Sequence, residues 1–340
     1  MLPIEYIWLD GNNQLRSKTR VLMNTPKEVS IKDIPEWNYD GSSTLQASNH
    51  ESEVILRPRR MFKSPFQNTS VLVLCDTHLP NGDPHPSNAR YKANTIFNKK
   101  RQANPWFGLE QEYFIMNPKT KEPLGYSTDL PKDYIDYYCG VGTNKAYGRN
   151  IANEHFMCCL TAGVILSGMN AEVAPGQWEY QVGPCEGIEA GDHLWISRYI
   201  LERVAEKYSA QVSYHPKVVK ENCNGSGCHM NFSTLEMREG TPTKSGLDFI
   251  HEAMTKLEEN HDEHMAVYGE DNEERMTGEN ETSDFEKFSW GVGSRTTSVR
   301  IPNETDKLKK GYFEDRRPAA NVEPYAATSI MFETTVLGGS

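Results

Sequence analysis

The segment WFGLEQEYF (residues 106–114) carries two glutamates at a spacing that suits metal binding. Glu110 and Glu112 are separated by one residue, and in a β-strand such residues point to the same face. Neighbouring carboxylates repel and raise each other's pKa, so we expect a positive group to lie between them. The alternative interpretation is an exposed strand edge with two solvated glutamates, an arrangement common on protein surfaces.

Two later segments add acidic and imidazole side chains. Glu179 lies among aromatic residues in the strand-like run QWEYQ (residues 177–181), and Glu186 follows just past its end. The run NGSGCHMNFS (residues 224–233) leads from a glycine loop into a strand that carries His229. A lone histidine is more often structural, so His229 becomes a candidate ligand only together with the carboxylates.

The segment GYFEDRRP (residues 311–318) interleaves acidic and basic side chains, which by itself suggests a surface ion-pair network. With the segments above, its first glutamate completes a set of five carboxylates and one imidazole. Such oxygen-rich sets bind hard divalent cations, and this one could supply two sites. The set is Glu110, Glu112, Glu179, Glu186, His229 and Glu314.

The charges in such a pair of sites nearly cancel. Five carboxylates and two Mg²⁺ or Mn²⁺ ions together leave one negative charge. Arginines could offset it, with positive charge remaining for phosphates and for a substrate carboxylate. The candidates are Arg295, Arg300, Arg316 and Arg317.

The elements that must position these side chains can be predicted from periodicity. The first 80 or so residues predict a small β domain, and the turn-forming run at residues 80–86 marks its end, with Ser87 as a helix cap. Strands and helices then alternate. The expected strands are 4–9, 14–22, 52–56, 71–75, 106–116, 171–182, 229–234 and 296–301, and the expected helices are 151–160, 192–208, 247–261 and 325–335.

One polar loop, residues 269–284, stands out by its seven acidic side chains. Its only bulky aliphatic side chain is Met276. A segment of this composition is expected to be mobile unless basic side chains or a metal ion bind it. It is therefore a candidate lid.

Composition excludes several functional classes. The 340 residues suggest about two domains. Lys and Arg total 36 against 47 Asp and Glu, and the net charge of −11 repels nucleic acid. The seven cysteines include no CxxC pair, which argues against a disulfide framework or zinc knuckle. We find no secretion signal and no membrane-spanning run, so we expect a cytoplasmic protein.

Seven segments in order along the chain resemble the type II, eukaryotic-type family of glutamine synthetases. Several motifs in register are far more specific than any one of them. The segments are WNYDGSST (37–44), WFGLEQEYF (106–114), NAEVAPGQWEYQVGPCEG (170–187), NGSGCHMNFST (224–234), RMTGENETS (275–283), SRTTSVRIP (294–302) and GYFEDRRP (311–318).

The resemblance implies an α+β fold of the glutamine synthetase/guanido kinase type. A small N-terminal β-grasp domain (residues 1–85) would be followed by a larger α/β catalytic domain (residues 86–340). It also implies a homodecamer of two stacked pentameric rings, with active sites between adjacent subunits.

The implied activity is ATP-dependent amidation of L-glutamate by ammonia through γ-glutamyl phosphate, with two or three Mg²⁺ or Mn²⁺ ions per site. The resemblance assigns one ion near the glutamate and ammonia to Glu112, Glu179 and Glu186. It assigns a second ion near the ATP phosphates to Glu110, His229 and Glu314.

Other residues match the family's substrate-binding positions. Arg295, Arg300 and Arg316 resemble the arginines that bind the γ-phosphate and substrate carboxylates, and Arg275 resembles the one that binds the glutamate α-carboxylate. The remaining matches are Asn224 and Gly225 for glutamate, and Trp106 and Ser233 for ATP.

Two residues correspond to groups that act around the intermediate. Glu281 resembles the flap glutamate that closes over the acyl phosphate and excludes water. Asp40 resembles the aspartate that binds ammonium and takes its proton, although an ordinary Asp-Gly turn is the alternative interpretation.

The chain departs from the family pattern at Asn303, where an arginine is usual, and at Asn280, where a histidine is usual. Two rival functions share most of these motifs. One is a ligase that joins the γ-carboxylate to another amine, which would differ around Asp40 and Glu281. The other is an inactive family member that serves as a scaffold or sensor, although such proteins normally lose metal ligands.

Overall fold

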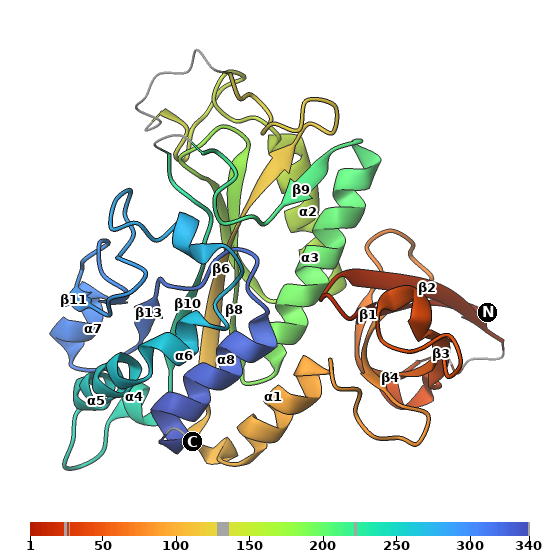
Figure 1. The fold of residues 1–340 in the computed structure, drawn as a ribbon, viewed down its shortest axis with the longest axis horizontal. Helices are drawn as coiled ribbons and strands as arrows, with labels where there is room; N and C mark the ends of the chain where they lie inside the picture. Colours follow the sequence, from red (N-terminus) through yellow and green to blue (C-terminus); the bar gives the residue numbers. More distant parts are fainter. Residues whose placement is uncertain (24–25, 27, 128–135, 221–222, 339–340) are drawn as a thin grey trace.

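The computed structural model describes residues 1–340 apart from 24–25, 27, 128–135, 221–222 and 339–340 (Figure 1). None of the helices in these described ranges is long and apolar enough to cross a membrane. The α-helices are α1 (Ala89–Asn98), α2 (Arg149–Ala162), α3 (Glu189–Lys207), α4 (Leu235–Glu239), α5 (Gly246–Glu259), α6 (His261–Met265), α7 (Asn303–Leu308) and α8 (Pro324–Phe332).

The N-terminal residues form a five-stranded sheet in the order β2-β1-β5-β4-β3. Successive side chains of its strands point to opposite faces of the sheet, and each face contributes to a different hydrophobic core. Tyr6 and Val73 belong to the sheet's own small core, whereas Ile7 and Leu74 belong to the main core of the larger domain. The sheet lies beside α3 (Figure 1). The strands are β1 (Leu2–Leu9), β2 (Leu15–Leu22), β3 (Trp37–Asp40), β4 (Glu53–Lys63) and β5 (Val71–His78).

The larger domain is built on an eight-stranded sheet in the order β11-β12-β13-β10-β6-β8-β7, with β9 pairing with β6. Its pairs are antiparallel except β11 with β12. The strands are β6 (Trp106–Met116), β7 (Leu166–Ala171), β8 (Gln177–Glu186), β9 (Gln211–Ser213), β10 (Cys228–Ser233), β11 (Trp290–Val292), β12 (Val299–Ile301) and β13 (Phe313–Asp315).

Helices cover one face of this sheet, and the other face carries polar side chains. Leu109 and Tyr113 of β6 are buried on the helix side, where Arg198 of α3 donates from Nε to Gln111 at 2.8 Å. The residues between them, Glu110 and Glu112, therefore point to the opposite face. The strand expected over residues 106–116 is observed with these bounds and with the expected facing.

The predicted fold class, with a small β domain before a larger mixed catalytic domain, is confirmed. Three predicted strands are clearly wrong in their bounds. Residues 52–56 are only the beginning of β4, which extends to Lys63. Residues 171–182 are not one strand, because β7 ends at Ala171 and a turn precedes β8 at Gln177. Residues 296–301 form a strand only from Val299 onward.

Candidate active site

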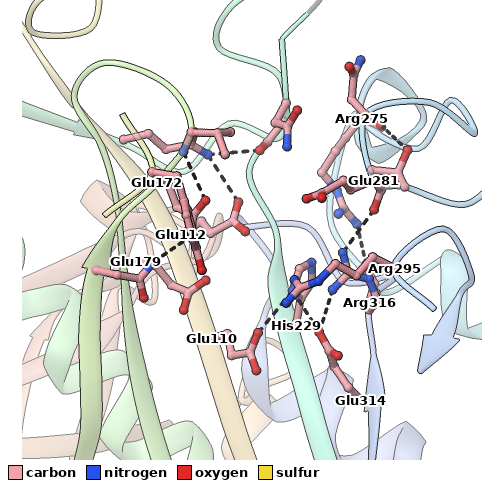
Figure 2. A pocket seen from close by; sticks show the side chains of 18 of the residues that line it. Glu110, Glu112, Glu172, Glu179, His229, Arg275, Glu281, Arg295, Glu314 and Arg316 are labelled. Atoms are coloured by element: carbon pink, nitrogen blue, oxygen red, sulfur yellow. Dashed lines mark hydrogen bonds and ion pairs between the residues drawn. The ribbon is translucent and has the colours of Figure 1, made fainter. Parts of the chain in front are cut away.

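A cavity of about 650 Å³ lies over the polar face of the larger sheet (Figure 2). Side chains from β6, β8, β10 and β13 form its floor, and the acidic loop contributes to its wall. Six glutamates, one histidine and four arginines line it, so its surface is strongly charged. The arginines are Arg275, Arg295, Arg300 and Arg316.

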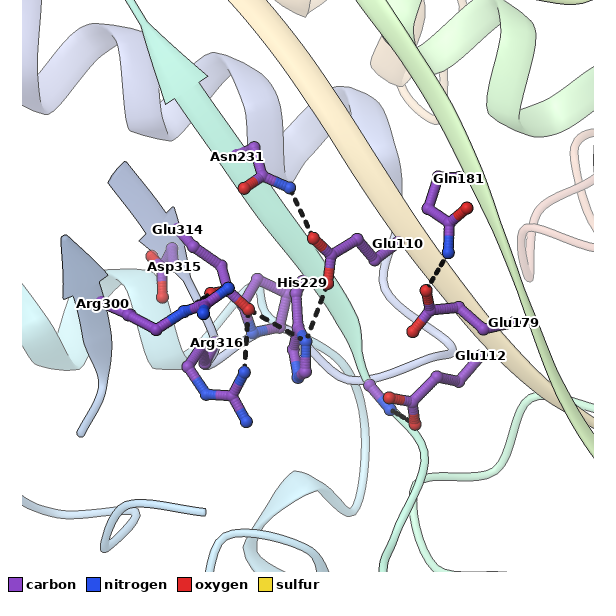
Figure 3. Close-up of polar contacts among 12 residues, drawn as sticks. Glu110, Glu112, Glu179, Gln181, His229, Asn231, Arg300, Glu314, Asp315 and Arg316 are labelled. Carbon is purple, nitrogen blue, oxygen red and sulfur yellow. Dashed lines mark hydrogen bonds and ion pairs between the residues drawn. The ribbon is translucent and has the colours of Figure 1, made fainter. Parts of the chain in front are cut away.

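The first of two ligand clusters joins Glu110, His229 and Glu314, with one candidate ligand atom of each within 4.8 Å of the others. Strand register explains this meeting, because Glu110 of β6 lies directly opposite His229 of β10. The imidazole Nδ1 lies 3.3 Å from Glu110 Oε2 and 3.4 Å from Glu314 Oε1 (Figure 3). Burial raises the pKa of Glu110, but His229 and Asn231 outweigh it and the pKa is lowered overall.

The second cluster joins Glu112, Glu172 and Glu179, again with ligand atoms within 4.8 Å of one another. Glu112 lies opposite Glu179 across β6 and β8. Glu172 follows β7 in the turn that leads to β8, and its Oε1 accepts a bond from Asn170 Nδ2 at 2.8 Å. Figure 2 shows the three carboxylates side by side, with no arginine or lysine labelled between them.

Burial and mutual repulsion perturb this second cluster strongly. Burial, reinforced by neighbouring glutamates, raises the pKa of Glu179 to about 8 and that of Glu172 to about 7. The pKa of Glu112 is raised for the same reasons, although Gly227 N donates to its Oε2 at 2.8 Å. Three crowded carboxylates with these pKa values fit a divalent cation, which would replace the missing positive charge.

The structure corrects one expected ligand. Glu186 neither lines the cavity nor belongs to either cluster, and it is exposed at the far end of β8. It pairs with Trp106, and Trp106 is six residues, about 20 Å, from Glu112 along β6. Glu172 occupies the place expected for Glu186. Pro175 and Gly176, between Glu172 and Glu179, are typical turn residues. They could have predicted the hairpin that brings the two glutamates together.

Three of the four cavity arginines, Arg275, Arg300 and Arg316, are held by carboxylates, an amide oxygen or backbone oxygens. Arg316 Nη1 donates to Glu314 Oε1 at 2.8 Å, and Arg300 Nε also pairs with Glu314 (Figure 3). Arg316 Nε is buried and has no hydrogen-bond partner within the described part of the chain. A buried, unpaired guanidinium N–H at a cavity wall fits an anionic ligand.

The expected glutamate-contacting residues, Asn224 and Gly225, also line the cavity. A Cβ on Gly225 would lie 2.4 Å from both Arg275 Cγ and Pro216 O, so only glycine fits there. Arg275 is buried, and burial lowers its pKa to about 10 although Glu112 acts in the opposite direction.

The acidic loop reaches the cavity through Asn280, Glu281 and Thr282. Its tip is strained, because Asn280 and Glu281 have positive φ angles of 52° and 61°. Arg316 Nη2 donates to the carbonyl oxygen of Glu281 at 3.1 Å, which attaches the loop to the cavity floor.

Besides Glu186 and the candidate arginine Arg317, three predicted site residues lie outside this cavity. Trp106 and Ser233 face each other across β6 and β10, near their far ends. Arg238 lies 4.0 Å from the Trp106 ring centroid and donates to Ser233 Oγ at 3.0 Å. Asp40 is exposed in the N-terminal sheet, where it caps the turn formed by Gly41–Thr44.

The fold and site together define a class of protein. Two all-protein donor sets for hard cations lie beside four arginines in one cavity, an arrangement suited to metal-dependent chemistry on phosphates and carboxylates. A family model described as glutamine synthetase, catalytic domain, matches residues 87–339.

Relatives of nearly full length agree with this match. A cytosolic glutamine synthetase isozyme of Arabidopsis thaliana is 49% identical over 339 residues, covering 98% of this chain and 94% of its own. The glutamine synthetase of Agaricus bisporus is 48% identical, covering 99% and 94%. A chloroplastic glutamine synthetase of Brassica napus is 48% identical, covering 98% and 78%.

The chain belongs to the glutamine synthetase family, in its eukaryotic-type branch. It is a glutamate–ammonia ligase, whose family uses ATP, glutamate, ammonia and divalent metal ions.

Proposed function

We propose that the two clusters hold the divalent cations of this ligase, Mg²⁺ or Mn²⁺. Glu112, Glu172 and Glu179 would bind one ion, and Glu110, His229 and Glu314 would bind a second. The observation that carries this assignment is the convergence of each donor set within 4.8 Å in one cavity. Bound there, the ions supply charge neutralisation for ATP phosphates and for the glutamate side chain.

The protein's own groups then position the substrates. Asn224, Gly225 and Arg275 bind glutamate with its side chain directed at the cavity floor. Arg295, Arg300 and Arg316 bind the γ-phosphate in line with that carboxylate, and the unpaired Nε of Arg316 supports this role. A carboxylate is a poor electrophile, so phosphoryl transfer to γ-glutamyl phosphate is what makes attack by ammonia feasible.

Two further residues handle water and the ammonium proton. Glu281 sits on a loop that Arg316 holds at the cavity, and from there it excludes water from the acyl phosphate. Asp40 takes the proton of ammonium. Hydrogen bonds from Ser42 lower the pKa of Asp40, which favours the charged carboxylate that would attract ammonium.

The assembly and the nucleotide site extend this proposal. Trp106 and Ser233 bind the nucleotide at the far end of β6, and Arg238 stacks beside them. The boundary at residues 85 and 86 separates the two domains, and ten subunits form two stacked rings in which Asp40 reaches a neighbour's cavity. A cytoplasmic location agrees with the cytosolic name of the Arabidopsis relative.

The test is an assay of glutamine and phosphate formed from ATP, glutamate and ammonium, with and without Mg²⁺ or Mn²⁺. Activity should require a divalent ion. Glu281→Ala should raise phosphate release above the equimolar ratio to glutamine, because water enters. Glu279→Ala is the matched control, since Glu279 is exposed on the same loop and does not line the cavity. Equal ratios in both variants would contradict the lid role.

A further inference from the structure

The strand end at residues 314–317 directs alternate side chains to opposite sides. Glu314 and Arg316 line the cavity. Asp315 and Arg317 do not, and both have 0% exposed surface on the other side. The catalytic function described above makes no use of this fully buried ion pair.

The buried pair is bidentate and enclosed by aromatic rings. Arg317 donates from Nε to Asp315 Oδ1 at 2.9 Å and from Nη2 to Asp315 Oδ2 at 2.7 Å. The guanidinium carbon lies 5.2 Å from the ring centroid of Tyr268 and 5.1 Å from that of Phe288. This geometry suits the planar guanidinium of arginine and not a lysine.

A chain of hydrogen bonds fixes Asp315 from a second direction. Tyr268 Oη donates to Asp315 Oδ2 at 2.8 Å. The hydroxyl therefore accepts from His264 Nδ1 at 2.7 Å, and His264 Nε2 accepts from Thr334 Oγ1 at 2.9 Å. Each member has its partner, and such a fully satisfied buried network permits one arrangement of β13.

Arg317 also connects to both ends of the acidic loop. Its carbonyl oxygen accepts from Asn272 Nδ2 at 2.8 Å and from Arg275 Nη2 at 2.6 Å, at the loop's beginning. Its Nη1 donates to His261 Nδ1 at 3.0 Å, and His261 Nε2 donates to Phe285 O at 2.9 Å, at the loop's end. One residue thus joins the strand that carries Glu314 to the loop that carries Glu281.

We propose that Arg317, Asp315 and His261 form a positioning unit that sets Glu314 and Arg316 in the cavity and holds both ends of the Glu281 loop. These three residues do not touch the cavity, so they act through the groups they hold. The inference rests on the proposed roles of Glu314 as a metal ligand and Glu281 as a lid.

The first test is Arg317→Lys. Lysine keeps the charge but cannot bond both Asp315 oxygens and His261 at once. Binding of Mn²⁺ alone, measured by calorimetry on the intact protein, should weaken by about tenfold, the scale seen when groups supporting a metal ligand are removed. Phosphate release per glutamine should also rise.

The second test, His261→Phe, cuts only the connection to Phe285 and leaves the Asp315–Arg317 pair in place. It should raise phosphate release per glutamine while leaving Mn²⁺ affinity at the wild-type value. A general loss of stability would not change phosphate release per glutamine while leaving Mn²⁺ affinity unchanged. His261→Phe also keeps the proposal testable if Arg317→Lys does not fold.

The matched control is Arg90→Lys. Arg90 makes another bidentate pair, partly buried, with both contacts to Asp192 at 2.8 Å and away from the cavity. It should lower thermal stability and change neither readout. Unchanged Mn²⁺ binding in Arg317→Lys together with unchanged phosphate release in both variants overturns the positioning unit alone. A wild-type protein that fails to bind Mn²⁺ overturns the metal assignment and this inference with it.

Discussion

Glu172 precedes β8 and Glu186 is the last residue of that strand, and of these two glutamates only Glu172 lines the cavity. Glu172 follows β7 and lies with Glu112 and Glu179, whereas Glu186 lies at the opposite end of β8, paired with Trp106. What separates them is distance along the sheet, because a strand advances about 3.3 Å per residue.

This difference can be measured by charge-neutral substitutions. Glu172→Gln should weaken Mn²⁺ binding by about tenfold or more, because a neutral amide replaces a charged ligand in the second cluster. Glu186→Gln is the matched control and should bind Mn²⁺ as the wild type does. Calorimetry on the two purified variants makes the comparison. Weaker binding in Glu186→Gln than in Glu172→Gln would return the assignment to Glu186.

Three helices of the catalytic domain each bury a histidine that is held neutral. Burial lowers the pKa of His155 in α2 and of His193 in α3 to about 4, and that of His264 in α6 to about 3. In the unfolded chain these groups return to the ordinary value of about 6.5. Between about pH 4 and 6.5 the unfolded state therefore binds more protons than the folded state.

Because of this difference, stability from these histidines is fully present above about pH 6.5 and is lost as the pH falls toward 4. His155→Gln should reduce the pH slope of the unfolding free energy by up to about 1.4 kcal/mol per pH unit in that window. Urea titrations at a series of pH values measure the slope. Cys159→Ala, beside His155, is the control and should lower stability without changing the slope. Equal slopes in wild type and His155→Gln would contradict the prediction.

At the scale of the whole molecule, Asp40 is separated from the cavity of its own chain. It ends β3 in the N-terminal sheet, which lies on the far side of α3 from β10 and β13 (Figure 1). Asp40 can act in catalysis only if another subunit brings its cavity to this surface, as the proposed ring assembly would do.

Mixing two inactive variants tests that arrangement. Asp40→Ala removes the carboxylate that the N-terminal sheet would supply to a neighbour's cavity. Glu314→Gln removes a proposed metal ligand from the cavity itself. If sites are shared, oligomers reassembled from equal amounts should recover about a quarter of wild-type activity, because that share of random neighbours combines an intact Asp40 with an intact cavity. Each variant reassembled alone is the control. Absence of recovery in verified mixed oligomers would place the whole site within one chain.

Much of the site follows from local pattern. The alternation of a strand by itself places Glu110 with Glu112, and the described structure brings both into one cavity. Glu314 and Arg316 also line that cavity, although the pattern of residues 311–318 alone indicated a surface ion-pair network. The glycines of residues 224–227 likewise predict a loop, and the acidic composition of residues 269–284 predicts a candidate lid. Such features depend only on neighbouring residues, so periodicity and turn chemistry are sufficient to predict them.

The sequence by itself determined which side chains share a face and which family the chain resembles. Only the tertiary structure decided that Glu172 completes the second cluster, that Glu186 does not, and that Arg317 joins β13 to both ends of the acidic loop. Those choices depend on where a hairpin turns and on the register between strands far apart in the chain. Both are settled by packing of the whole sheet against its helices, which local spacing does not encode.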